Sequence, residues 1–256
     1  MNPAAWLARI GPPLAAALAL LAVWELYVDL SGIEPWRLPA PSAIARELAA
    51  GFPRVWMHTA ASLKVAVMGL ASGTAAGIAL ATAMHFLFPW IRNMFYPLII
   101  LTQNIPIIAI APLFIVWFGF QSILPKLIVI TLVCFFPVLV AALQGFAYTD
   151  RRMVNYMRMI GASRGQLFWK LEFPHALPHL FSGLKVAGTY SMMGAVISEW
   201  LGSENGLGVY MRLAQSSFRT DRIFVAIVMI VAASLLFFAL ISALERALVR
   251  GGRRKE

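Results

Sequence analysis

Charged residues are scarce in this sequence: aspartate, glutamate, lysine and arginine make up only 12% of 256 residues, whereas hydrophobic residues make up 61%. A soluble globular domain ordinarily has about 25% charged and about 45–50% apolar residues. The apolar excess is too large for a single soluble core. The apolar runs are continuous rather than alternating, which excludes a transmembrane β-barrel. The composition therefore predicts an all-α polytopic membrane protein.

Signals of enzymatic chemistry are also few. The sequence has no G-x-x-x-x-G-K-[ST] loop that could hold nucleotide phosphates. Its single cysteine, Cys134, lies in an apolar run without an obvious base, so an internal disulfide is excluded and a core position is expected. We therefore expect a non-catalytic chain that binds no cofactor itself.

Acidic residues are outnumbered, with 11 against 21 lysines and arginines, which gives a formal net charge of +10. Basic chains can bind nucleic acid, but here the basic residues border apolar runs and form no patch with interleaved aromatic residues. This distribution is typical of segments anchored beside anionic lipid. The expected partner is therefore the lipid bilayer, and no nucleic acid.

Six apolar stretches are long enough to cross a bilayer, which requires about 20 residues. They cover residues 13–31, 59–84, 93–119, 122–147, 181–202 and 222–245. We interpret residues 1–256 as one transmembrane domain with a core unit at 59–245 and an uncleaved first span. Six spans place both termini on one side, and the basic tail at 246–256 indicates the cytoplasm. The sequence thus predicts a multi-pass protein of the cell (inner) membrane.

Small and apolar residues recur at helical spacing in two places. In the second span, Gly69, Gly73 and Gly77 form overlapping GxxxG units, which allow close packing of another helix in lipid. In the polar segment before that span, the spacing predicts a helix lying at the membrane interface, with Ile44, Leu48 and Phe52 on its apolar face.

Polar and aromatic side chains within the spans are candidates for a substrate path, because such groups are costly in lipid unless they face a cavity or a partner helix. The candidates are Gln103, Asn104, Trp117, Tyr190 and Met193, and for each of them core packing is an open alternative. Glu199 is the most informative carboxylate. It either lines the path or pairs with Arg212 or Arg219 in the following loop.

A polar segment at residues 148–180 separates the fourth and fifth spans. Asp150 is a good N-cap for a short helix that ends at Gly161. Ser163 and Gln166 have the spacing of a capping box that begins a second helix, which we expect to end at Pro174. The segment therefore predicts a helix, a glycine hinge and a helix lying flat at the cytoplasmic surface.

The same segment contains two histidines four residues apart, His175 and His179. On a helix this spacing suits a metal ion. However, Pro174 and Pro178 are expected to interrupt the helix and hold the chain extended, and no third ligand is near in sequence. We therefore predict no metal site.

The stretch "GASRGQLFWKLEFPHALPHL" (161–180) resembles the EAA loop of ATP-binding-cassette importer permeases. Gly161 and Ala162 match its glycine-alanine pair, Phe168 its aromatic residue, and the residues at 177–178 its hydrophobic-proline step. The Glu-Ala-Ala of the family would fall on residues 155–157, where this chain has asparagine, tyrosine and methionine. Three more stretches, at residues 105–120, 134–140 and 198–211, resemble the nitrate, sulfonate and taurine branch, and within it permeases assigned to pyrimidine precursors of thiamine.

This resemblance implies partners that the chain does not contain. A cytoplasmic ATPase dimer would hydrolyse ATP and receive the coupling loop, and an extracytoplasmic binding protein would deliver the solute. The implied coupling residues are Asn155, Tyr156, Met157, Arg158, Gly161, Ala162 and Arg164. Because one chain offers only half a pathway, a symmetric homodimer is the expected working form.

Several alternatives stay open from the sequence. The solute could be a pyrimidine thiamine precursor, a sulfonate, nitrate, taurine or riboflavin. From other classes, the chain could be an ion-gradient-driven transporter or channel, or a membrane scaffold without transport. Transporters of the first kind often carry inverted repeats and paired intramembrane charges. Residues 1–120 and 121–256 show no convincing repeat, and Glu199 is the one plausible ion ligand.

Overall fold

The computed structural model describes residues 3–87, 94, 97–99, 101, 106–119 and 122–249. Within these residues every regular element is a helix, which confirms the all-α prediction. The elements are α1 (Pro3–Ser31), α2 (Pro41–Phe86), α4 (Ile107–Phe118), α5 (Leu124–Ala147), α6 (Arg151–Met159), α7 (Arg164–Leu167), the π-helical η1 (Phe168–Glu172), α8 (Phe173–Leu201), α9 (Leu207–Ser216) and α10 (Thr220–Val249).

Five helical stretches are long and apolar enough to cross a membrane: Gly11–Ser31, Pro41–Phe86, Leu124–Ala147, Arg164–Trp200 and Thr220–Val249. They overlap five of the predicted spans, so the polytopic class is confirmed. The remaining predicted span, 93–119, lies partly outside the described residues. Its described part contains α4, a shorter apolar helix of 12 residues. The number of six spans stays a prediction.

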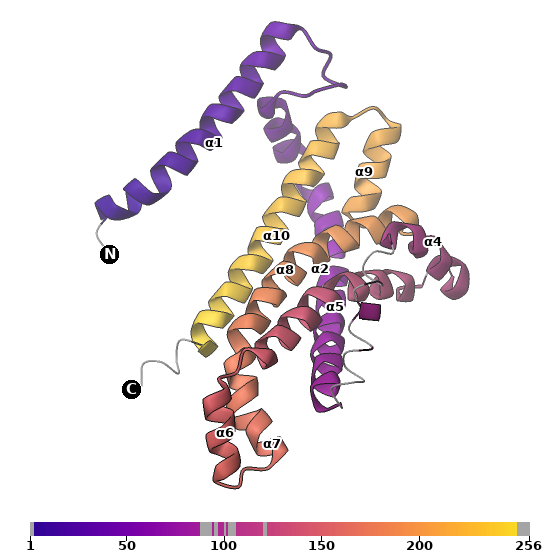
Figure 1. Ribbon diagram of the computed structural model, residues 1–256. Coiled ribbons are helices and arrows are strands. Elements are labelled where there is room, and N and C mark those ends of the chain that lie inside the picture. The colour runs from indigo at the N-terminus through magenta and orange to yellow at the C-terminus, as the bar shows by residue number, and fades with distance from the viewer. Residues whose placement is uncertain are drawn as a thin grey trace.

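The helices form a bundle with different features at its two ends (Figure 1). α2 and α8 pack against each other, and each of them packs against α5 and α10, whereas α1 leans away and is exposed along almost all of Gly11–Ser31. α6 and α7 project from one end of the bundle, and α9 lies at the opposite end. α10 runs from the α9 end back toward the end that carries α6 and α7. We call these the α6–α7 end and the α9 end.

A close helix crossing in the bundle joins α2 to α5. Gly69, Gly73 and Gly77 are buried there, on the face of α2 that meets α5. A Cβ atom built on Gly73 would lie 2.7 Å from Cβ of Cys134 and 2.8 Å from the carbonyl oxygen of Thr131. The glycines therefore lie where the α5 backbone approaches too closely for a side chain, as expected when packing joins helices in lipid. Cys134 is buried and free, as the sequence indicates.

The predicted interfacial helix before the second span is wrong as a separate element. Its residues are helical, but they form the first turns of α2, which continues without a break through Pro53 to Phe86. Ile44 is buried in the main core rather than lying on a lipid surface. The tertiary contacts of this segment outweigh the hydrogen bond that the proline removes.

The predicted helix end at Pro174, with an extended chain at Pro178, is also wrong. α7 passes through η1 into α8, and both prolines lie in α8. In η1 the N–H of Phe173 donates to the carbonyl of Phe168, five residues earlier. Local π-helical adjustment of this kind allows prolines within membrane helices. The sequence could not show it, because a proline after an amphipathic turn ordinarily ends a helix.

We predict that Gly73→Ala destabilises the protein by about 1–3 kcal/mol, because the new methyl group overlaps the α5 backbone. Unfolding in mixed micelles with increasing denaturing detergent measures the change. Gly51→Ala in the same helix is the control, since its Cβ would meet only Glu47 Oε1 at 3.8 Å. Equal effects of the two substitutions would contradict the assigned close crossing.

Candidate functional site

The α6–α7 unit, residues 150–167, begins with a capped helix that none of the described residues covers. Asp150 caps α6, and its side chain accepts a hydrogen bond from the N–H of Arg152 at 2.8 Å, as predicted. No residue of α6 is buried. Tyr156 is 57% exposed and Met159 is 78% exposed. Large apolar groups displayed in this way mark a surface that another molecule covers.

A glycine hinge joins α6 to α7. Gly161 has φ +83°, a left-handed conformation that residues with a Cβ rarely adopt. The predicted capping box follows: Ser163 Oγ accepts from the N–H of Gln166, and Gln166 Oε1 accepts from the N–H of Ser163. These contacts fix the angle between the two short helices.

The seven residues predicted to couple to an ATPase all lie in this unit. Asn155, Tyr156, Arg158, Gly161 and Arg164 are exposed, and Met157 and Ala162 are partly exposed. The structure therefore brings them together on one projection at the α6–α7 end.

Residues 161–165 also have the G-x-S-x-G spacing that carries the nucleophile of some hydrolases. That motif requires a strand before the serine, whereas here α6 precedes it. Ser163 Oγ is engaged in the cap of α7. The local structure therefore supports a capping role for this serine.

A groove of about 740 Å³ lies between α4, α5 and α8. Its walls are mainly valine, isoleucine, proline and phenylalanine side chains, with Gln144, Ser182 and Tyr190 as polar members. Of the predicted path residues, Tyr190 and Met193 line this groove. Trp117 is 64% exposed on α4 and does not line it, and Gln103 and Asn104 lie outside the described residues.

Glu199 lies at the α9 end, where it caps α9. Its side chain is buried, and Oε2 accepts hydrogen bonds from Ser62 Oγ at 2.8 Å and from the N–H of Gly208 at 3.0 Å. Ser62 Oγ in turn accepts from the N–H of Leu207 at 2.8 Å. A carboxylate is stabilised at a helix N-terminus by the unpaired backbone donors there.

A histidine and a glycine complete this cap. Nδ1 of His58 accepts from the N–H of Gly206 at 3.2 Å. Gly206 has φ +129°, and a Cβ on it would lie 2.2 Å from the carboxyl carbon of Glu199. The first amides of α9 are thus held by side chains from α2 and α8, and the glycine leaves room for the carboxylate.

The predicted pairing of Glu199 with a basic residue is wrong, whereas its place on a substrate path stays a prediction. Glu199 is not among the described residues that line the groove. Its predicted alternative partners are engaged elsewhere: Arg212 donates to the carbonyl of Trp200, and Arg219 pairs with Glu47 and Asp221. The carboxylates of Asp221 and Glu47 raise the pKa of Arg219 above its ordinary value. The sequence signal that was missed is the spacing of His58 and Ser62, four apart on one face of α2.

The two histidines of the central segment lie in α8. The ring of His179 stacks on Tyr148 with centroids 5.4 Å apart and planes 4° apart. Among the described residues, no group of three or more His, Cys, Asp or Glu side chains could hold a metal ion.

The chain resembles known transport proteins along most of its length. A family model described as "Binding-protein-dependent transport system inner membrane component" matches residues 73–253. The formylaminopyrimidine transport permease protein ThiX of Halalkalibacterium halodurans is 34% identical over 91% of this chain and 92% of its own length. The riboflavin transport system permease protein RibX of Chloroflexus aurantiacus is 32% identical, over 94% of this chain and 90% of its own length. The taurine transport system permease protein TauC of Escherichia coli is 31% identical, over 90% and 85%.

We predict that Glu199→Ala destabilises the α9 end by about 1–3 kcal/mol, because the buried donors of Gly208 and Ser62 lose their acceptor. Thermal unfolding in detergent and hydrogen exchange of the amides at 206–208 measure the effect. Glu199→Gln keeps one acceptor oxygen and should lose less. Glu204→Ala, an exposed carboxylate in the same loop, is the control. Unchanged exchange at 206–208 in Glu199→Ala would refute the cap.

Proposed function

Because the chain belongs to the family of binding-protein-dependent transport system inner membrane components, we propose that it is the membrane subunit of an ATP-driven importer. The matches confirm the resemblance to importer permeases that the motifs indicated. The observation that carries the proposal is the exposed α6–α7 unit, a capped pair of short helices that the described part of the chain leaves uncovered. The multi-pass helical fold fits a permease.

A cytoplasmic ATPase dimer is the partner that we assign to the α6–α7 unit. The unit displays arginines beside apolar side chains, at positions 151, 152, 158 and 164, and such a mixed surface suits a groove with acidic and apolar walls. The sequence lacks a phosphate-binding loop, so the ATPase has to be a separate chain. We therefore propose that the α6–α7 end and both termini lie in the cytoplasm, as the basic residues at 246–256 favour.

A second copy of the chain and a solute-binding protein complete the proposed assembly. The groove between α4, α5 and α8 is open and apolar, so a partner face has to cover it before it can conduct a solute through the bilayer. Two copies related by a twofold axis would enclose a path between them. The binding protein would dock at the α9 end, which is the outer end in this orientation.

A pyrimidine of the kind named for the ThiX relative is the solute that we favour. The described lining of the groove has no charged side chain, and its polar groups are one amide, one hydroxyl and one phenol. An uncharged flat ring can pass along such a wall by stacking and single hydrogen bonds. A sulfonate or taurine would lose its hydration without an opposite charge, which is costly. The riboflavin named for another relative has similar chemistry and is the second candidate.

We predict that Gly161→Val weakens binding of the ATPase about 5- to 30-fold, because a β-branched residue at φ +83° costs about 1–2 kcal/mol in the hinge. Deletion of residues 155–164 should abolish binding. Co-purification of the ATPase with the tagged permease, at equal permease yield, measures both. Gly165→Ala is the matched control, since a Cβ there meets no atom within 4 Å. Wild-type amounts of ATPase with the deletion variant would exclude the α6–α7 unit as its docking site.

A further inference from the structure

The α6–α7 unit is attached to the bundle through few buried groups. α6 has no buried residue, and in the segment that follows it only Leu167, Phe168 and Glu172 are buried before α8 begins. Apart from residues 148–150, which link α6 to α5, any force on the α6–α7 unit therefore reaches the bundle through this short stretch. Phe168 and Glu172 are four residues apart in η1, at the point where the helix widens into a π turn.

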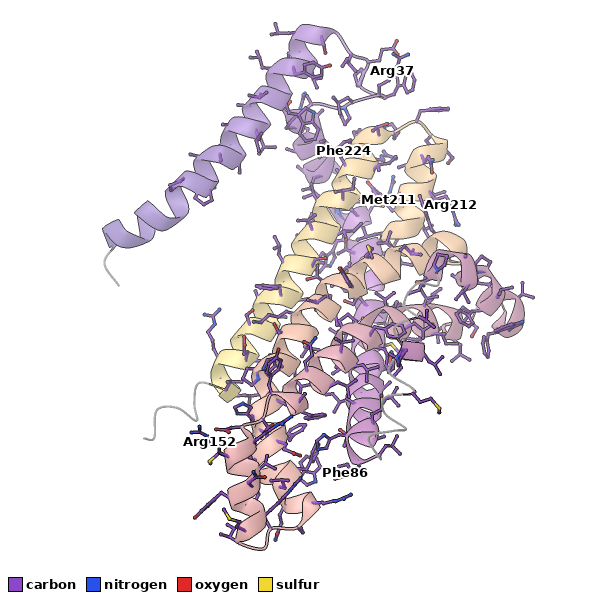
Figure 2. The ribbon with its side chains drawn as sticks, viewed as in Figure 1. Arg37, Phe86, Arg152, Met211, Arg212 and Phe224 are labelled. Atoms are coloured by element: carbon purple, nitrogen blue, oxygen red, sulfur yellow. The ribbon has the colours of Figure 1, made fainter. Side chains whose placement is uncertain are left out.

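Phe168 is the centre of an aromatic cluster that joins three helices. Its side chain is 1% exposed, and its ring centroid lies 5.1 Å from that of Phe86, 5.5 Å from His85 and 5.2 Å from Phe146. Tilted ring pairs at these separations attract one another beyond simple burial. Phe86 and His85 form the last turn of α2, and Phe146 belongs to the last turn of α5. Figure 2 shows Phe86 at the end of the bundle where Arg152 of α6 lies.

A polar contact joins the same two elements beside the rings. Oε2 of Glu172 lies 2.8 Å from Nε2 of His85, and the Glu172 residue is only 8% exposed. A buried carboxylate without a partner costs free energy, so this pair holds η1 and the end of α2 together. η1 is therefore fixed to α2 by two different interactions, ring packing and a hydrogen bond.

We infer that Phe168, Glu172 and His85 form a transmission joint that carries movement of the α6–α7 unit into α2 and α5 as well as into α8. The inference rests on the proposed function, because the movement is the one that an ATPase would impose. Through the chain alone, the unit pulls on α5, through residues 148–150, and on α8, which is continuous with η1. The joint adds α2, so that the three helices lining and backing the groove move as one rigid body. All three side chains are largely buried, so they act as positioning residues and contact neither ATPase nor solute.

The test measures coupling in the complete importer, reconstituted in liposomes with its ATPase and binding protein. Glu172→Ala and Phe168→Leu should leave the amount of bound ATPase unchanged and keep ATP hydrolysis within about twofold of wild type. Solute uptake per ATP hydrolysed should fall about 2- to 30-fold, the range expected when a coupling contact is lost. Lys170→Ala, an exposed side chain in the same π turn, is the control and should keep the wild-type ratio.

Rescue separates coupling from folding. The exchange of the pair, His85→Glu together with Glu172→His, should restore much of the uptake that either single change removes, and Glu172→Gln should lose less than Glu172→Ala. The joint is refuted if uptake per ATP stays at the wild-type value in Glu172→Ala and Phe168→Leu, or if both variants lose assembled complex and the exchange variant does not recover it. Failure of the proposed function is distinct: the wild-type chain itself would then show no uptake that depends on ATP and binding protein.

Discussion

Helix α2 is the element on which the two ends of the bundle depend. In hydrocarbon, irregular backbone has to find its partners within the protein. At the α9 end, His58 and Ser62 of α2, together with Glu199, hold the first amides of α9. At the α6–α7 end, His85 and Phe86 in its last turn hold the π turn before α8. Between these ends, the glycines of α2 allow α5 to approach closely. One 46-residue helix therefore holds both the start of α9 and the π turn before α8.

In the importer that we propose, this arrangement gives each end a different task. Buried polar contacts between α2, α8 and α9 hold the α9 end together. Ion pairs also join the N-terminal part of α2 to the start of α10. Figure 2 shows Met211 and Arg212 of α9 on this end, far from Arg152. The α6–α7 end instead exposes arginines and large apolar side chains on a capped projection. Contacts within the chain hold the α9 end together, whereas the α6–α7 end exposes the surface that we assign to a partner.

Much of the architecture could be predicted from the sequence, because local signals decide it. Apolar runs predict the helices, GxxxG spacing predicts that another helix packs closely on α2, and Asp150, Ser163 and Gln166 predict both caps of the α6–α7 unit. The errors arise where distant residues decide the outcome. Pro174 stays in a helix because a π turn precedes it, and Glu199 caps α9 because Ser62, 137 positions away, lies beside it. No local sequence pattern indicates either the π turn or the contact of Glu199 with Ser62. The groove likewise depends on which faces of α4, α5 and α8 meet.

The central claim is that ATP hydrolysis by a partner drives uptake through this chain. The most direct measurement is uptake of labelled formylaminopyrimidine into liposomes that contain the permease and its ATPase, with the binding protein outside and ATP inside. The account predicts uptake that requires both the binding protein and hydrolysable ATP, and that an ion gradient does not replace. Uptake by the purified chain alone, driven by an ion gradient without ATP, would contradict it.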